Sequence, residues 1–535
     1  MNGYGGEDGP MRTRKIVLFW VKLIAICCIL AVVINTAGSV LTNGDDVIRN
    51  AAALKTLPRN SVDVFFCGTS HAHYDVIPQL LYDEYGVTST MVSGNSVDFS
   101  QSYWQIRQAL LRQKPEVIVL DVYPAAAPYC YFYVQNVLAT QTANSKPRGS
   151  NAYNTASSMA RWLPLGSPYK IPAIAEAYNS FGLEGEAYFE MTRFHSRYGE
   201  LRRGEFQNVK GQKRHVHNFG YLYGDNVLDY AVVDTQPYSP EAALVTNEAG
   251  TFWTFTDEQI AQAEMNKKTI ADLKRIVDFT RRKGIELVLC VAPYATNVVE
   301  KKLFAEVEKL AAEWEVPFVR AEDSPANEEK YFRDLGHLND AGARINTVFW
   351  GEYFSKHYSL SDRRTQQDAR YQPWRERAGS YDQQHAAMQL RRYEGGLTGY
   401  LEAISALASD HLLLFTIKGD VYDGFTEDDY WLMVDELGIP EEELETWSYA
   451  GCGTLDLLLM DGELMYSNYA YGGRREADTR SIRGYDVSFG ENRWYVNGKS
   501  AGDIETGFNV SVYSMIDEKL MDFRAFDMTE IYLDE

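Results

Sequence analysis

The stretch VDVFFCGTSH, residues 62–71, places an apolar run directly before a glycine and a short polar segment. The run Val62–Cys67 predicts a fully buried strand that ends at Gly68. A second apolar run, EVIVLDV at residues 116–122, predicts another buried strand. Between the two, SQSYWQIRQALLRQ at residues 100–113 is amphipathic with helical spacing. Strands that alternate with helices in this way predict a parallel sheet with helices on both faces.

The middle of the chain repeats this alternation. A capping-box pattern at residues 256–259 starts a long predicted helix, which Gly284 closes after three basic residues. The apolar stretch ELVLCV, residues 286–291, then predicts another buried strand. The region of residues 135–251, rich in Tyr, Gly and Asn, interrupts the pattern and is interpreted as an insertion. We therefore expect one α/β domain over residues 55–357.

Polar residues follow the predicted strands at their carboxyl ends, where open parallel sheets bind ligands. Ser70 follows the first strand, and Asp334 and His337 lie three residues apart before the last predicted helix of the domain. A serine hydroxyl is a weak nucleophile that needs a neighbouring base and a group to hold that base. A serine after a glycine is most often only a turn residue, but the combination at strand ends is more specific. We predict Ser70 as nucleophile, His337 as base and Asp334 as the group that orients it.

The same strand ends carry candidate donors for an oxyanion hole. These are the backbone N–H groups of Ser70 and Gly94 and the side chain of Asn95. A direct donor of this kind is worth roughly 3–4 kcal/mol to the transition state. The remaining histidines have weaker interpretations. His71 and His73 have no local carboxylate pattern typical of a metal site, and His357 and His385 are predicted as surface residues.

Two short motifs carry a family resemblance. The segment G-T-S-H at residues 68–71 resembles block I of the SGNH/GDSL hydrolases, and D-L-G-H-L-N at residues 334–339 resembles their D-x-x-H block V. The longer stretches around the first and third strands are similar to the DltD-like branch, the D-alanyl-lipoteichoic acid biosynthesis family and its relatives. The similarity covers residues 61–356, apart from the insertion. It implies a flavodoxin-like three-layer fold, the same triad, and Gly94 as the block II glycine.

The resemblance also implies a function. It points to transfer or hydrolysis of an O-acyl group on a cell-envelope polysaccharide or teichoic-acid-like polymer, through an acyl-enzyme on Ser70. It implies no cofactor and no metal, and a membrane-bound O-acyltransferase (MBOAT) as partner. His71, Asp121 and Tyr123 are candidate substrate-binding residues on this interpretation.

One motif departs from the family pattern. The G-x-N-D of block III is absent, and the third strand ends in Asp121-Val122-Tyr123 instead. The residue that replaces the block III asparagine is therefore open. Two alternatives to acyl transfer also stay open: a plain carbohydrate or lipid esterase, and a non-catalytic cell-surface carbohydrate- or protein-binding protein on a degenerate SGNH scaffold.

The composition argues against one class of partner. The chain of 535 residues has 52 Lys and Arg against 74 Asp and Glu, a net charge of −22. Because nucleic-acid binding needs a basic face, this balance argues against nucleic acid as a partner. The six cysteines form no zinc-binding pattern and no dense disulfide framework. Cys67 and Cys290 are predicted to be buried free thiols.

An apolar run near the N-terminus, Ile16–Ala37, has the length of about 20 residues that a membrane-spanning helix needs. Basic residues precede the run, and Asp45 and Asp46 follow it. The positive-inside rule therefore predicts that residues 1–15 are cytoplasmic and that the domains beyond the anchor are extracytoplasmic. The alternative is a cleaved signal peptide, but the run is longer than the ~7–15 apolar residues of such a peptide. We expect a single-pass membrane anchor over residues 16–37.

The last part of the chain has a different pattern. Residues 358–390 are polar and charged with little periodicity, which is typical of a linker. Residues 391–535 contain short predicted helices and strands, which indicate a smaller α+β domain. Its segments LEAISALASDHLLLFTIKGD (401–420) and GFNVSVYSMIDEKLMDFRAFD (507–527) resemble the interleukin-like EMT inducer (ILEI-like) domain, in permuted order. The resemblance implies a non-catalytic, carbohydrate-binding module.

Overall fold

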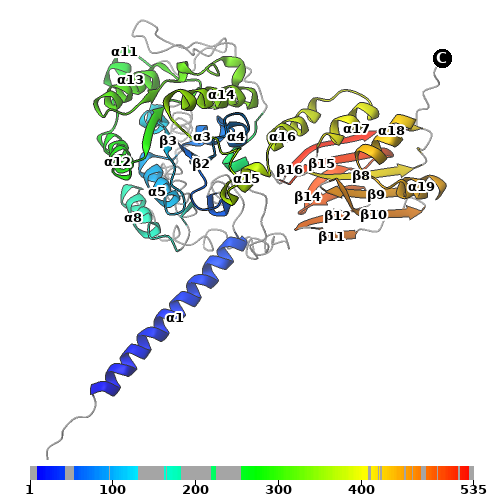
Figure 1. Cartoon of the computed structure of the whole chain (residues 1–535), viewed down its shortest axis with the longest axis horizontal. Helices are drawn as coiled ribbons and strands as arrows, with labels where there is room; N and C mark the ends of the chain where they lie inside the picture. The colour runs from blue at the N-terminus through cyan, green and yellow to red at the C-terminus, as the bar shows by residue number, and fades with distance from the viewer. Residues whose placement is uncertain are drawn as a thin grey trace, which may run out of the picture. The chain divides into compact units, whose positions relative to one another are not determined.

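The structure is a computed structural model of the chain (Figure 1). It describes residues 9–41, 54–95, 97–129, 162–163, 166–181, 218–224, 255–407, 411–419, 421, 424–450, 453–460, 462–471, 478–482, 484–490, 492–515 and 519–528. Most of the predicted insertion, residues 135–251, lies outside the described residues.

A five-stranded, wholly parallel sheet forms the centre of the first folded part. Its order is β2-β1-β3-β4-β5, with these bounds: β1 Val64–Gly68, β2 Ser89–Ser93, β3 Val117–Asp121, β4 Glu286–Cys290 and β5 Phe318–Val319. Every residue of β1, β2 and β3 is buried, as expected for strands covered on both faces. The prediction of a mixed α/β fold with a parallel sheet is confirmed.

The helices around this sheet pack in two pairs. α4 (Pro78–Tyr85) packs against α14 (Asp340–His357), and α5 (Phe99–Ala109) packs against α12 (Lys267–Lys283). α13 (Val298–Glu313) lies next to β5. In the core beneath α14, the ring of Phe66 from β1 contacts the rings of Trp350 and Phe354 at centroid distances of 5.8 and 6.2 Å.

The helix before β4 differs from the sequence prediction. The capping box of Thr256 and Gln259 is present, but it starts only the short helix α11 (Asp257–Gln262). Ala263 then has an extended backbone, and the Asn266 side chain caps a new helix, α12, which ends at Gly284 as predicted. An asparagine competes well for the backbone N–H groups at a helix start, so the long predicted helix becomes two.

A sharp turn connects β1 to α3 (Ser70–Tyr74). Gly68 has a φ of +125°, which side chains rarely allow, and a Cβ atom there would lie 2.9 Å from the Cβ of Asp121. The turn therefore requires glycine for two reasons, backbone conformation and space. It brings the ends of β1 and β3 together and places Ser70 in the first turn of α3.

A small hairpin carries the second part of the candidate site. β6 (Phe332–Asp334) pairs with β7 (His337–Leu338), and the N–H of Gly336 donates to the Asp334 carboxylate at 2.8 Å. The Asn339 side chain then caps α14 by accepting from the N–H of Gly342. The hairpin and the helix cap together hold the Asp334–His337 segment in one conformation.

The N-terminal helix α1 extends over Gly9–Leu41. Its segment Arg14–Ile34 has a mean hydropathy of 2.9 and is long and apolar enough to cross a membrane. The predicted apolar helix is thus present, by length and composition. The direction in which it would cross stays a prediction.

The polar segment predicted as a linker makes specific contacts with the α/β part. Arg363 donates three hydrogen bonds of 2.6–3.1 Å to the buried carboxylate of Asp63. Trp374 in α15 (Gln372–Arg375) is buried and stacks on Phe219 with the two rings 4.6 Å apart. The helix α16 (Ser380–Gln389) follows. Some of the charged residues that made this segment resemble a linker in the sequence therefore bind partners distant in the chain, as Arg363 binds Asp63.

The C-terminal part contains two antiparallel sheets (Figure 1). The first has the order β10-β9-β8-β15-β16, and the second the order β11-β12-β13-β14. Their bounds are β8 His411–Gly419, β9 Gly453–Met460, β10 Glu463–Tyr471, β11 Asp478–Ile482, β12 Tyr485–Phe489, β13 Arg493–Val496, β14 Lys499–Asp503, β15 Gly507–Ser514 and β16 Lys519–Phe526. The helices here are α17 Leu397–Ser405, α18 Glu427–Trp431 and α19 Glu441–Ala450.

Alternate residues of the central strands face two different cores. Leu412 and Leu414 of β8 pack with Trp494 of the second sheet. Leu413 and Phe415 instead pack in a core that includes residues of α17 and α19. Because successive side chains of a strand point to opposite faces, one apolar strand serves both layers.

The turn at Gly68 gives a stability prediction. Gly68→Ala should lower the free energy of unfolding by roughly 2–4 kcal/mol, because the new Cβ adds a clash with Asp121 to an unfavourable backbone conformation. Gly284→Ala is the matched control: its φ is +66°, but a Cβ there meets nothing within 4 Å, so a loss of about 1 kcal/mol is expected. Thermal unfolding followed by circular dichroism compares the two. Equal losses would contradict the close approach of Gly68 to Asp121.

Candidate active site

Three side chains distant in the sequence form a hydrogen-bonded chain. His337 Nε2 lies 2.8 Å from Ser70 Oγ, and His337 Nδ1 lies 2.8 Å from Asp334 Oδ1. Because an ionised carboxylate only accepts, Nδ1–H donates to Asp334, which leaves Nε2 to accept from the Ser70 hydroxyl. The structure thus brings together the predicted nucleophile, base and orienting carboxylate. This arrangement can move the Ser70 proton onto His337.

The surroundings of His337 and Asp334 determine the protonation states of these two side chains. Burial lowers the pKa of His337 below its usual value of 6.5, and although Asp334 opposes this, the nearby charges of His71 and Arg333 add to the lowering. Burial alone would raise the pKa of Asp334, but its hydrogen bond and charge interaction with His337 lower it. Asp334 is therefore ionised and His337 neutral near neutral pH, which is the state that a general base requires.

Arg333 and Tyr74 flank the hydrogen-bonded chain. Arg333 Nε lies 3.3 Å from Asp334 Oδ2, and its guanidinium lies 4.7 Å from the centroid of the Tyr74 ring. The Tyr74 ring in turn lies 4.6 Å from the His337 ring. Neither residue was singled out from the sequence, although Arg333 directly precedes Asp334 and Tyr74 lies one helical turn after Ser70.

The predicted oxyanion hole is only partly present. The N–H of Ser70 lies in the first turn of α3, where helix N–H groups have no acceptor within the helix. The N–H of Gly94, in contrast, donates to the carbonyl of Gly68 at 3.2 Å, so it is engaged within the fold. Asn95 is exposed, and its side chain opposes the lowering of the pKa of His73. The prediction that the Gly94 N–H is an oxyanion donor is therefore corrected, because this N–H connects the ends of β2 and β1.

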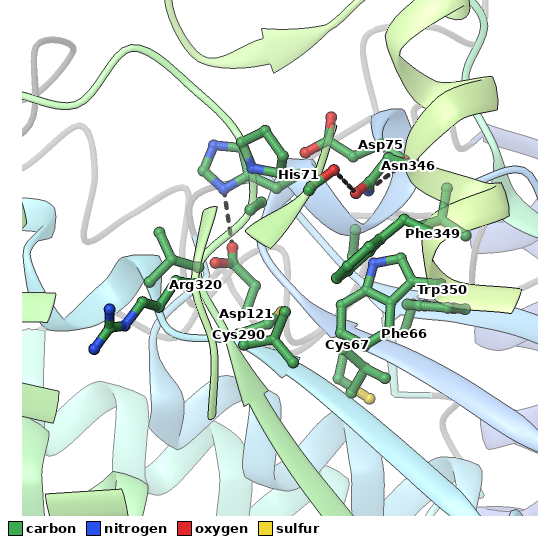
Figure 2. A pocket seen from close by; sticks show the side chains of 18 residues that line it. Phe66, Cys67, His71, Asp75, Asp121, Cys290, Arg320, Asn346, Phe349 and Trp350 are labelled. Carbon is green, nitrogen blue, oxygen red and sulfur yellow. Dashed lines mark hydrogen bonds and ion pairs between the residues drawn. The ribbon is translucent and has the colours of Figure 1, made fainter. Parts of the chain in front are cut away.

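A second histidine–aspartate pair joins His71, the residue after Ser70, to Asp121 at the end of β3 (Figure 2). His71 Nδ1 lies 3.0 Å from Asp121 Oδ2, and both side chains are buried. The Thr69 hydroxyl donates to the same oxygen at 2.6 Å, while the N–H of Tyr123 donates to Oδ1 at 3.0 Å. Both oxygens of Asp121 are therefore engaged inside the protein. Asp121 orients His71 and is not arranged for the direct substrate contact predicted from the sequence.

Aromatic rings enclose His71 on two sides. The Tyr294 ring stacks on it at 4.8 Å, and the Tyr123 ring meets it edge-on at 4.9 Å. The His71 and His337 rings are 5.7 Å apart. Tyr294 follows β4 and was missed in the sequence, where its position just after a predicted strand was the available signal.

His71 and Asp121 also line a small cavity with a volume of about 30 Å³, whose lining side chains Figure 2 shows. Cys67, Asp75, Cys290 and Asn346 are among the residues that line it. This volume is that of roughly one water molecule, too small for an acyl chain. Cys67 and Cys290 are buried free thiols, as predicted, and burial raises the pKa of both well above the ordinary value. They are therefore not reactive groups.

The remaining histidines have different surroundings. Burial lowers the pKa of His73 to about 3, so this residue is neutral, and its Nδ1 lies 3.0 Å from Ser93 Oγ. His385, predicted as a surface residue, is partly buried, and its Nδ1 lies 2.7 Å from Asp340 Oδ2. The partner lies 45 residues away, which no local pattern indicates. Within the described ranges, no group of three or more His, Cys, Asp or Glu residues is arranged to hold a metal ion.

Comparison with known proteins adds no family assignment. No protein-family model matches the chain, and no curated protein sequence matches it.

The lowered pKa of His337 gives a prediction about Ser70. Neutral His337 is needed to accept the serine proton, so the rate at which a fluorophosphonate reacts with Ser70 should rise with pH, with a midpoint below pH 6.5. Asp334→Asn removes a charge that raises this pKa, so the midpoint should move lower and the plateau rate should fall. The pH dependence of labelling of the full chain in detergent measures both effects. His357→Ala is the control, and a wild-type midpoint above pH 6.5 would contradict the assignment.

Proposed function

We propose that this protein is a membrane-anchored, extracytoplasmic serine enzyme of the SGNH type that transfers or hydrolyses O-acyl groups. The observation that carries the proposal is the chain Ser70–His337–Asp334, with both hydrogen bonds at 2.8 Å, at the carboxyl side of a parallel sheet. The two helix pairs around that sheet, α4 with α14 and α5 with α12, support a flavodoxin-like three-layer arrangement.

The proposed reaction has two halves. Ser70 Oγ attacks the acyl carbonyl while its proton passes to His337 Nε2, and the carbonyl electron pair moves onto oxygen to form a tetrahedral oxyanion. Collapse of this intermediate expels the alcohol, which takes the proton from His337, and leaves an acyl-enzyme on Ser70. Water or a sugar hydroxyl then repeats the sequence in reverse. The acceptor decides whether the outcome is hydrolysis or transfer.

The setting of the enzyme follows from the rest of the chain. The apolar helix α1 supports attachment to a membrane, and the basic residues before it support a cytoplasmic N-terminus. We propose a cell-envelope polysaccharide or teichoic-acid-like polymer as substrate and an MBOAT protein as donor of acyl groups, on the DltD-like resemblance. The ILEI-like resemblance of residues 391–535 supports a polymer-binding role for the C-terminal part.

One observation favours the alternative of a binding protein on a degenerate SGNH scaffold. The N–H of Gly94 is engaged by Gly68, so one predicted oxyanion donor is not open. The intact hydrogen-bonded chain at Ser70 argues against that alternative, because a scaffold that only binds has no need to keep His337 neutral beside a serine hydroxyl.

Ester turnover distinguishes the serine enzyme from the binding protein. The full chain in detergent should hydrolyse p-nitrophenyl acetate, and mass spectrometry should detect acetyl-Ser70. Ser70→Ala and His337→Ala should each lower kcat at least about 10³-fold, because nucleophile and base act as a unit. Ser355→Ala, in which the lost hydroxyl only bonds the Gly351 carbonyl within α14, is the matched control. Unchanged turnover in Ser70→Ala would contradict the proposal, and faster release of p-nitrophenol with an added sugar acceptor would indicate transfer.

A further inference from the structure

We propose that His71, fixed by Asp121, is a cationic group beside Ser70 that stabilises the oxyanion of the tetrahedral intermediate. This inference rests on the proposed acyl-transfer function. It also offers an answer to the missing block III asparagine, since the strand that would carry that motif here carries Asp121 and so holds a histidine in place.

The first argument is geometric. His71 directly follows Ser70 in α3, and its ring is 5.7 Å from the ring of His337. Asp121, engaged by Thr69 and Tyr123, accepts from His71 Nδ1, so the second ring nitrogen, Nε2, remains for another interaction. Within the described part of the chain no group bonds to His71 Nε2. The stacked Tyr294 ring and the Tyr123 ring contact the His71 ring on two sides.

The second argument is electrostatic. Burial alone would lower the pKa of His71, but the charge and hydrogen bond of Asp121 outweigh burial and raise it above 6.5, with smaller contributions from Asp75 and Glu300. Burial raises the pKa of Glu300 itself to about 8, and that of Asp75 well above its usual value. Glu300 is therefore largely neutral near pH 7. Asp121 is the group that contributes most to raising the pKa of His71.

The groups that face His71 come from several elements. They are Asp121 at the end of β3, Asp75 after α3, Glu300 in α13, Tyr123 after β3, Tyr294 after β4 and His337 in β7. The pKa of His337 is lowered, whereas that of His71 is raised, and the charge on His71 is one cause of the lowering. Two neighbouring histidines held in opposite protonation states indicate a division of labour: His337 takes the proton, and His71 supplies charge.

The charge acts without any change of bonds at His71. When Ser70 Oγ bonds to the acyl carbon, the negative charge that develops on the carbonyl oxygen forms next to an imidazolium already in position. No proton leaves His71 during the step. A fixed cation in a site shielded from water stabilises such a charge because it needs no reorganisation.

The pH profile of kcat/KM for p-nitrophenyl acetate, measured on the full chain in detergent, tests this inference. We expect a bell shape: activity rises below pH 6.5 as His337 loses its proton, and falls above pH 6.5 as His71 loses its own. His71→Gln should lower kcat/KM roughly 10- to 100-fold, less than or similar to the loss of a direct oxyanion donor. It should also abolish the alkaline limb and move the acid limb to higher pH. Asp121→Asn should move the alkaline limb to lower pH.

His385→Gln is the matched control, because it removes the histidine of another His–Asp pair, 2.7 Å from Asp340, outside the proposed machinery. Both limbs should stay in place. A folded His71→Gln variant with the wild-type rate and alkaline limb would overturn the inference while leaving acyl transfer intact. If that variant does not fold, a wild-type profile without a fall between about pH 6.5 and 9 would overturn it equally. Absence of ester turnover in the wild type would overturn acyl transfer and, with it, the role of His71.

Discussion

The close approach of Gly68 to Asp121 is the constraint on which the rest of the site depends. A side chain on residue 68 would collide with Asp121, and the φ of +125° excludes most other residues on conformational grounds. With glycine there, Asp121 reaches the segment after β1 and accepts from Thr69 and His71. These bonds fix the first turn of α3 and therefore the position of Ser70.

Electrostatic interactions then shift the pKa values of two similarly bonded histidines in opposite directions. His71 and His337 each pair with an aspartate through Nδ1, at 3.0 and 2.8 Å. The pKa of His337 is lowered by burial and by the neighbouring positive charges, whereas that of His71 is raised because the buried Asp121 outweighs burial. Each histidine supports the state of the other, since a charge on His71 disfavours a second charge on His337. One base and one cation can thus coexist within one small site.

The polar segment after the α/β part contributes to the same architecture. Asp340, the first residue of α14, accepts hydrogen bonds from Tyr221, Tyr381 and His385. Tyr381 and His385 belong to α16, and Asp340 lies three residues after His337. The segment between the two folded parts therefore supports the start of the helix that follows the His337 hairpin, and is more than a connection.

The sequence by itself determined the features that depend on local pattern. Continuous apolar runs indicated the buried parallel strands, because a strand covered on both faces needs apolar residues at successive positions, and a longer run indicated the apolar N-terminal helix. The residue types and places of Ser70, Asp334 and His337 predicted that these three side chains come together, as they do in the hydrogen-bonded chain. Only the tertiary structure decided which donors are engaged: the Gly94 N–H with Gly68, His71 with Asp121, and His385 with Asp340. A hydrogen bond between residues tens of positions apart depends on the packing of whole elements, so no spacing along the chain encodes it.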